Sequence, residues 1–143
     1  MTSKKSIELK DAIYPLFNAM TDFTELSVKN ELDKLLAPEC MINMCFPFEE
    51  IKGTKAFYEA TYRPLLKSFP DLERRNLIVL AGETPEQQEW VACMGNYLGT
   101  FLSPFLEIPP TGHLSHMRFH EFFRFKNGKV VEIQAIWDLP ELM

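Results

Sequence analysis

Hydrophobic residues in the first half of the chain recur at helical spacing. The first apolar stripe lies within residues 6–20 and consists of Ile7, Ile13, Leu16, Phe17 and Met20. It predicts a helix that Pro15 should kink or split, because proline lacks the amide donor of an internal helical hydrogen bond. A second helix is expected to begin at Asp22, with Glu25 completing a capping box, and to end before Pro38.

The residues that follow predict one short strand and one more helix. The apolar run CMINMCFPF, residues 40–48, favours a strand. A third helix is expected after Gly53, with Thr54 as its N-cap and Pro64 bending its last turn. The predicted helices therefore all lie before residue 70.

After residue 70 the pattern changes to apolar and β-branched runs separated by turns. These runs, at residues 72–82, 89–101, 114–125 and 129–138, predict a meander of three or four long strands. Asn127-Gly128, between the last two runs, is a strong hairpin signal. Helices first and strands afterwards predict an α+β fold, with helices on one face of a curved, mainly antiparallel sheet. Residues 1–143 are expected to form a single domain.

The segment GHLSHMRFHEFFRF, residues 112–125, contains all three histidines of the chain. In a strand, alternate residues share a face, so one face would carry Met117, Phe119, Glu121, Phe123 and Phe125. The opposite face would carry His116, Arg118, His120, Phe122 and Arg124. His116 and His120 would then lie about 13 Å apart along the strand, too far to bind one zinc ion together. No metal site is expected here.

Glu121 is the one charged residue on the apolar face of this predicted strand. A carboxylate among phenylalanines loses hydration, which suits it to general acid or base chemistry. The alternative is that a neighbouring donor satisfies Glu121 and its role is structural. If Glu121 is buried and unpaired, Glu121→Gln should stabilise the fold at neutral pH.

The register of the hairpin decides which residues of the last two strands face each other. A two-residue turn places Glu121 opposite Gln134. A three-residue turn with a glycine bulge places His120 opposite Gln134 and His116 opposite Asp138. The second register separates polar from apolar positions more cleanly and is the preferred prediction. It puts four residues of the last strand on the apolar face: Val131, Ile133, Ala135 and Trp137.

Composition and charge limit the kinds of partner that the protein is expected to bind. A net charge of −5 and a pI near 5.2 argue against nucleic acid, which requires a basic surface. No apolar run approaches the ~20 residues that span a bilayer. The N-terminus lacks the apolar core of a signal peptide, so no membrane partner and a cytoplasmic location are expected. Cys40, Cys45 and Cys93 have no C-x-x-C spacing and are expected to be small buried residues.

Four segments carry a resemblance to a known family: SFPDLERR, GNYLGTF, IPPTGH and NGKVVEIQAIWDLPELM. In this order and spacing they resemble the SnoaL-like polyketide cyclases of the nuclear transport factor 2-like superfamily, over roughly residues 12–143. The resemblance implies a cone-shaped barrel whose helices cover the concave face of the sheet and leave an apolar pocket. It also implies a lyase or isomerase without metal or organic cofactor, since characterised members close a polyketide ring by an intramolecular aldol reaction.

The resemblance implies acid–base residues near the last strand. By its position after GKVVE, the aspartate of the family corresponds to Asp138. The nearest candidates for its histidine and glutamine partners are His116, His120 and Gln134. Glu121, if protonated, is a further donor.

Three other residues have two interpretations each. Arg118 could hold an anionic substrate, or could pair with a neighbouring carboxylate on the strand. Trp137 and Tyr97 could line a substrate pocket, or could be ordinary core aromatics.

Two functions of different classes remain. The first is a cofactor-independent acid–base enzyme acting on a small apolar carbonyl compound in a hydrophobic pocket. The alternative is a non-catalytic protein that binds a hydrophobic ligand in the same fold. Epoxide hydrolysis, which on this fold uses an Asp-Arg-Asp set of residues, is the least favoured function. Asp138 and Arg118 could supply two of these residues, but the sequence offers no assignable third. Relatives commonly dimerise through the convex side of the sheet, so a homodimer is also expected.

Overall fold

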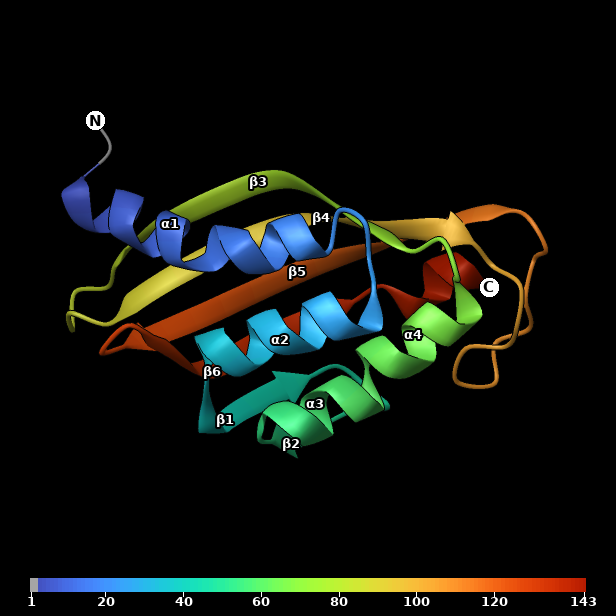
Figure 1. The fold of residues 1–143 in the computed structure, drawn as a ribbon, viewed down its shortest axis with the longest axis horizontal. Helices are drawn as coiled ribbons and strands as arrows, with labels where there is room; N and C mark the ends of the chain where they lie inside the picture. Colours follow the sequence, from blue (N-terminus) through green and yellow to red (C-terminus); the bar gives the residue numbers. More distant parts are fainter. Residues whose placement is uncertain (1–2) are drawn as a thin grey trace.

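The structure is an open, curved sheet whose helices gather on one face (Figure 1). A computed structural model of the protein describes residues 3–143. The helices are α1 (Lys4–Ala19), α2 (Glu25–Leu35), α3 (Thr54–Ala60), α4 (Tyr62–Ser68) and the 3-10 helix η1 (Leu139–Leu142). The strands are β1 (Leu36–Met44), β2 (Glu50–Lys52), β3 (Glu73–Glu83), β4 (Glu89–Thr100), β5 (Leu114–Lys126) and β6 (Lys129–Trp137). Among these residues, no helix combines the length and apolarity that crossing a membrane requires.

The strand order is β2-β1-β6-β5-β4-β3. All neighbouring pairs are antiparallel except β1 and β6, which run parallel. The predicted α+β fold with a mainly antiparallel sheet is confirmed. The sheet is not closed into a barrel, because β2 and β3 remain separate edges and the helices cover the open side instead. Helix α1 lies over β3 and β4, while α2 and α3 lie over β1 (Figure 1).

The predicted division of β5 into two faces is confirmed. The five residues of its apolar face are buried: Met117, Phe119, Glu121, Phe123 and Phe125. All of them except Glu121 belong to one hydrophobic cluster with the buried stripes of α1 and α2, formed by Leu9, Ile13, Leu16, Phe17, Val28, Leu32 and Leu35. The interior of the protein therefore lies between the helices and the concave face of the sheet.

Helix boundaries differ from the predictions at three places, where single residues outweigh the pattern of hydrophobic positions. Helix α1 continues through Pro15, which is exposed, so water can solvate the carbonyl group that proline leaves unpaired. Thr24 rather than Asp22 caps α2, through a hydrogen bond from the Ser27 amide to its hydroxyl. The predicted third helix is two short helices that meet at Thr61.

Both predicted hairpin registers are wrong. Asn127-Gly128 forms a two-residue turn that pairs Lys126 with Lys129, and a bulge after Val130 then shifts the register. In consequence Glu121 pairs with Ala135, and His120 with Ile136. Ile133, Ala135 and Trp137 still face the interior as predicted, whereas Val131 is replaced there by Val130.

A second bulge, between Asn76 and Ile78 of β3, lies beside Gly95 of β4. A Cβ atom at Gly95 would lie 2.0 Å from the backbone oxygen of Arg75. The close approach of β3 to β4 therefore requires glycine at this position. The neighbouring inward residues, Arg74 and Tyr97, lie on the same two strands.

The SFPDLERR segment connects α4 to β3 and is held by Asp71. The Asp71 carboxylate accepts hydrogen bonds from the amide (2.7 Å) and the hydroxyl (2.8 Å) of Thr100. These bonds hold the pKa of Asp71 below its usual range. Asp71 thus fixes the start of β3 to the end of β4 and has a structural role.

Candidate active site in the sheet interior

Glu121 lies on the concave face of β5 and is 2% exposed. Its Oε1 accepts a hydrogen bond from Arg74 Nη1 at 2.6 Å. Its Oε2 accepts from the Tyr97 hydroxyl and from Trp137 Nε1, both at 2.8 Å. Both oxygens are therefore acceptors, and the carboxylate is held by donors from β3, β4 and β6.

Arg74 enters this interior from β3, and its side chain is fully buried. Besides Glu121, it donates to the Tyr97 hydroxyl at 2.6 Å and to Cys93 Sγ at 3.1 Å. The guanidinium also lies over the rings of Phe119 and Phe17, at 3.9 Å and 4.4 Å from their centroids. Ion pairing and cation–π contacts together offset its lost hydration.

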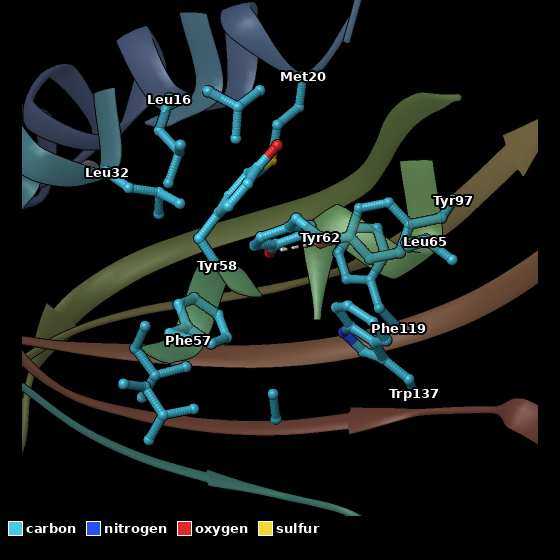
Figure 2. Packing of buried hydrophobic residues seen from close by; sticks show 14 of the residues in the cluster. Leu16, Met20, Leu32, Phe57, Tyr58, Tyr62, Leu65, Tyr97, Phe119 and Trp137 are labelled. Carbon is cyan, nitrogen blue, oxygen red and sulfur yellow. Dashed lines mark hydrogen bonds between the residues drawn. The ribbon is translucent and has the colours of Figure 1, made fainter. Parts of the chain in front are cut away.

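Tyr97 and Tyr62 form a hydrogen-bonded chain that ends at Glu121. The two hydroxyl groups are 2.9 Å apart (Figure 2). Because Tyr97 donates its single hydrogen to Glu121, Tyr62 must be the donor to Tyr97. Burial raises the pKa of Tyr62 and the pKa of Tyr97 well above the usual tyrosine range. Both are neutral hydrogen-bond donors at physiological pH.

The surroundings of this network are aromatic. The ring of Trp137 lies 5.6 Å from that of Tyr62 and 5.2 Å from that of Tyr97, measured between centroids. Phe119 contacts Tyr97 at 4.8 Å, and all four rings are visible in Figure 2. Charged and polar groups thus converge at one point of an otherwise apolar interior, where electrostatic interactions are strong.

Asp138 does not enter this interior. It follows β6, precedes η1, and lines a shallow hollow of about 420 Å³ with Arg118, His120, Ile136, Trp137 and Pro140. Because β5 and β6 alternate, residues adjacent to the buried Trp137 and Phe119 project to the outer side. Three of the predicted site residues, Asp138, His120 and Arg118, therefore share a hollow outside the interior network.

His116 and Gln134 lie on the outer face of the sheet, opposite to the face that carries Glu121. The His116 side chain is 66% exposed and its Nε2 lies 3.4 Å from the Glu141 carboxylate. Gln134 donates a hydrogen bond to Glu132 at 2.7 Å on the outer face. The predicted pair of His116 with Asp138 requires a register that the sheet does not adopt.

The structure unites three of the predicted residues, Glu121, Tyr97 and Trp137, and adds Arg74 and Tyr62, which the sequence analysis missed. Arg74 follows the buried Leu72 by two residues, which places both on the same face of a strand. Strand periodicity could therefore have predicted that Arg74 points inward. Tyr62 lies in the predicted third helix, where no sequence pattern singled it out. Within residues 3–143, no group of three histidine, cysteine or carboxylate side chains is placed to hold a metal ion.

The profile of the SnoaL-like polyketide cyclase family matches residues 16–143. The chain belongs to this family. Membership indicates a function of the cyclase or isomerase type, and it agrees with the resemblance found in the sequence. No curated protein matches the sequence.

Solved structures place this SnoaL-like chain in the same fold. A protein from Jannaschia sp. CCS1, assigned as a SnoaL-like polyketide cyclase, has a TM-score of 0.77 at 20% identity, covering 96% of this chain and 90% of its own. AclR from Streptomyces galilaeus, assigned as a hydroxylase, has a TM-score of 0.76 at 22% identity, covering 96% and 93%. IdmH from Streptomyces antibioticus, assigned as a polyketide cyclase, has a TM-score of 0.74 at 20% identity, covering 93% and 94%.

Proposed function

We propose that the protein is a cofactor-independent acid–base enzyme that acts on an apolar carbonyl compound, with Glu121 as its proton acceptor. The observation that carries the proposal is the convergence of Glu121, Arg74, Tyr97 and Tyr62 inside an aromatic interior. Asp138, the base implied by the resemblance, lies in the outer hollow instead. The proposal therefore assigns the chemistry to the interior carboxylate.

The proposed reaction begins with removal of a proton from the carbon next to a carbonyl group. The C–H electron pair moves onto the carbonyl oxygen, and the proton moves to a Glu121 oxygen. As Glu121 takes the proton, it releases its hydrogen bond from Tyr97, and the Tyr97 hydroxyl donates to the enolate oxygen instead, while Tyr62 continues to donate to Tyr97. The enolate carbon then attacks a second carbonyl of the same molecule, and the new alkoxide takes the proton back from Glu121.

The tyrosines suit this donor role because they stay neutral. A neutral donor in a dry apolar site stabilises a developing oxyanion more than it would in water. Ketosteroid isomerase, a worked example of this chemistry, likewise combines an acidic base with neutral donors in an apolar site. Arg74 positions Glu121 and supplies the balancing positive charge.

The first test is the exchange of the acetyl protons of 2-acetylnaphthalene for deuterium, followed by proton NMR in D₂O. This measures proton removal next to a carbonyl without knowledge of the natural substrate. The wild-type protein is expected to accelerate exchange, and Tyr97→Phe to slow it about 100-fold by removing one oxyanion donor. Tyr14→Phe removes a hydroxyl from the exposed side of α1 and is the matched control.

Two results would contradict the proposal. If Asp138→Asn lost the exchange activity while Tyr97→Phe kept all of it, the base would be Asp138 in the outer hollow. Absence of exchange in the wild-type protein, with saturable binding of the ketone, would favour the alternative of a non-catalytic ligand-binding protein. Circular dichroism of each variant confirms that it is folded at the assay temperature.

We also propose that the protein is a homodimer formed through the outer face of the sheet. Four large hydrophobic residues on this face are 44–63% exposed: Ile78, Leu80, Phe122 and Ile136. Leu80 and Phe122 both pair with Ala92, so they lie in one row across β3, β4 and β5. A contiguous exposed apolar patch of this kind supports a protein partner.

Sedimentation tests the dimer directly. At 10 µM we expect twice the 16.6 kDa mass of the chain, and a monomer for Phe122→Lys with nearly unchanged secondary structure. Leu26→Lys, a matched change of an exposed residue on α2, should leave the dimer intact. A wild-type monomer at this concentration would overturn the proposal.

A further inference from the structure

The Arg74 guanidinium has a hydrogen-bond acceptor at each of its three nitrogen atoms. Nη1 donates to Glu121 and Tyr97, and Nη2 donates to Cys93 Sγ. The remaining nitrogen, Nε, donates to the side-chain oxygen of Asn76 at 3.1 Å. Asn76 therefore holds the guanidinium at a different nitrogen from the one that contacts Glu121.

Asn76 is held next to Arg74 by the backbone of β3. The two residues are two positions apart on this strand, so both side chains point to the concave face of the sheet. Asn76 pairs with Gly95 of β4, and a Cβ atom at Gly95 would lie 3.0 Å from the Asn76 Cα. The backbone of the half-buried Asn76 is thus packed closely against β4, just before the bulge.

Glu121 alone balances the charge of Arg74. Within residues 3–143, these two are the only charged side chains among the buried residues. The other ionisable groups that face them are Tyr97 and Cys93 of β4 and Tyr62 of α4. Burial raises the pKa of the Cys93 thiol to about 12, and the two tyrosines are neutral as well. The side chains that α1 and β6 bring into contact with the pair are aromatic rings without an ionisable group.

An asparagine at residue 76 accepts the Nε hydrogen bond without adding a charge. Aspartate has nearly the same shape and would accept the same hydrogen bond, but it would be a second counter-ion for Arg74. Two carboxylates would then share one guanidinium, and each would disfavour the ionised form of the other. A neutral acceptor leaves the whole attraction of Arg74 to Glu121. That attraction keeps Glu121 ionised, as a base must be before it accepts a proton.

We propose that Asn76 is a positioning residue of the acid–base site, which holds the Arg74 guanidinium through Nε and leaves Glu121 as its only counter-ion. The inference rests on the proposed function, since it concerns the pH at which Glu121 works as a base. Asn76 does not touch the reacting atoms and acts through Arg74. Its effect therefore appears in the pH dependence of proton exchange.

The first test measures the exchange of 2-acetylnaphthalene as a function of pH in Asn76→Asp. The acidic limb of such a rate profile reports protonation of the base. The new carboxylate disfavours the ionised base, so this limb is expected to move by about one unit to higher pH. Asn30→Asp adds the same charge at an exposed position of α2 and is the matched control. Its profile should coincide with that of the wild-type protein.

The second test measures stability and requires no activity. Glu121→Gln leaves Arg74 without a counter-ion, and an aspartate at residue 76 would supply one at Nε. The double variant Asn76→Asp/Glu121→Gln is therefore expected to have a Tm about 5 °C above that of Glu121→Gln alone. Asn30→Asp/Glu121→Gln should have the Tm of Glu121→Gln. Thermal unfolding followed by circular dichroism gives all three values.

Three outcomes would overturn the role of Asn76. An unchanged pH profile in Asn76→Asp would mean that residue 76 does not influence the base, even if the double variant recovers stability. An equal shift of the profile in Asn30→Asp would assign the effect to the net charge of the protein. No recovery of Tm in the double variant would show that a charge at residue 76 does not reach Arg74.

Failure of the proposed function is distinguishable from these outcomes. If the wild-type protein shows no proton exchange, yet the double variant recovers stability, the contact of Asn76 with Arg74 stands and the acid–base role of Glu121 falls. If exchange occurs and neither effect of Asn76→Asp is seen, the role of Glu121 stands and that of Asn76 falls.

Discussion

Glu121→Gln is expected to destabilise the protein by about 3–5 kcal/mol, because it leaves the buried Arg74 guanidinium without its counter-ion. This reverses the expectation for an unpaired carboxylate, in which the same substitution stabilises the fold. The corresponding fall in Tm is about 10–17 °C. Thermal unfolding followed by circular dichroism at pH 7 measures it.

The double variant Arg74→Met/Glu121→Gln separates the ion pair from the packing around it. Methionine removes the charge that Glu121→Gln leaves unpaired, so the double variant is expected to be more stable than Glu121→Gln alone. A double-mutant cycle then isolates the coupling between the two residues. Stability of Glu121→Gln equal to or above wild type would show that the pair contributes nothing.

Gly95→Ala is the second substitution with a large expected effect. The new methyl group would lie 2.0 Å from the Arg75 carbonyl oxygen, so β3 must move away from β4. We expect a loss of about 2–4 kcal/mol, comparable to other overpacked or strained core positions. Because Arg74 is displaced with β3, proton exchange should fall as well. Chemical denaturation measures the first effect, and the NMR assay the second.

Gly82→Ala is the matched control, since it lies on the same pair of strands and its Cβ atom would meet nothing within 4 Å. It should leave stability within about 0.5 kcal/mol of wild type. A similar loss in both variants would assign the effect to glycine in a strand generally and not to the bulge beside Gly95.

The fold class could be predicted from the sequence because it follows from local periodicity. Alternation in β5 placed Glu121 among the buried residues and His120 outside, as the structure shows. The helices followed from apolar stripes, and the errors fell at ends such as Thr24, where a single hydroxyl hydrogen bond decides the boundary. The barrel that the family resemblance implies is not closed, because β2 and β3 remain separate edges of the sheet.

The candidate site was harder to predict because it depends on register and on distant partners. One bulge after Val130 brought Ala135 opposite Glu121 and removed Asp138 from the interior. Arg74 and Glu121 are 47 positions apart, and no local pattern pairs them. The sequence could show that a carboxylate was buried, but only the arrangement of β3, β4 and β5 shows which cation balances it.

The parallel pairing of β1 with β6 has a consequence for synthesis of the chain. Strand β1 joins the rest of the sheet through β6, which is synthesised after all the other strands of this sheet. Until residue 137 emerges, α2, β1 and β2 have no sheet to complete, and their apolar faces stay exposed. The sheet is therefore complete only after β6 has emerged, and until then the exposed apolar faces of α2, β1 and β2 are natural binding sites for chaperones.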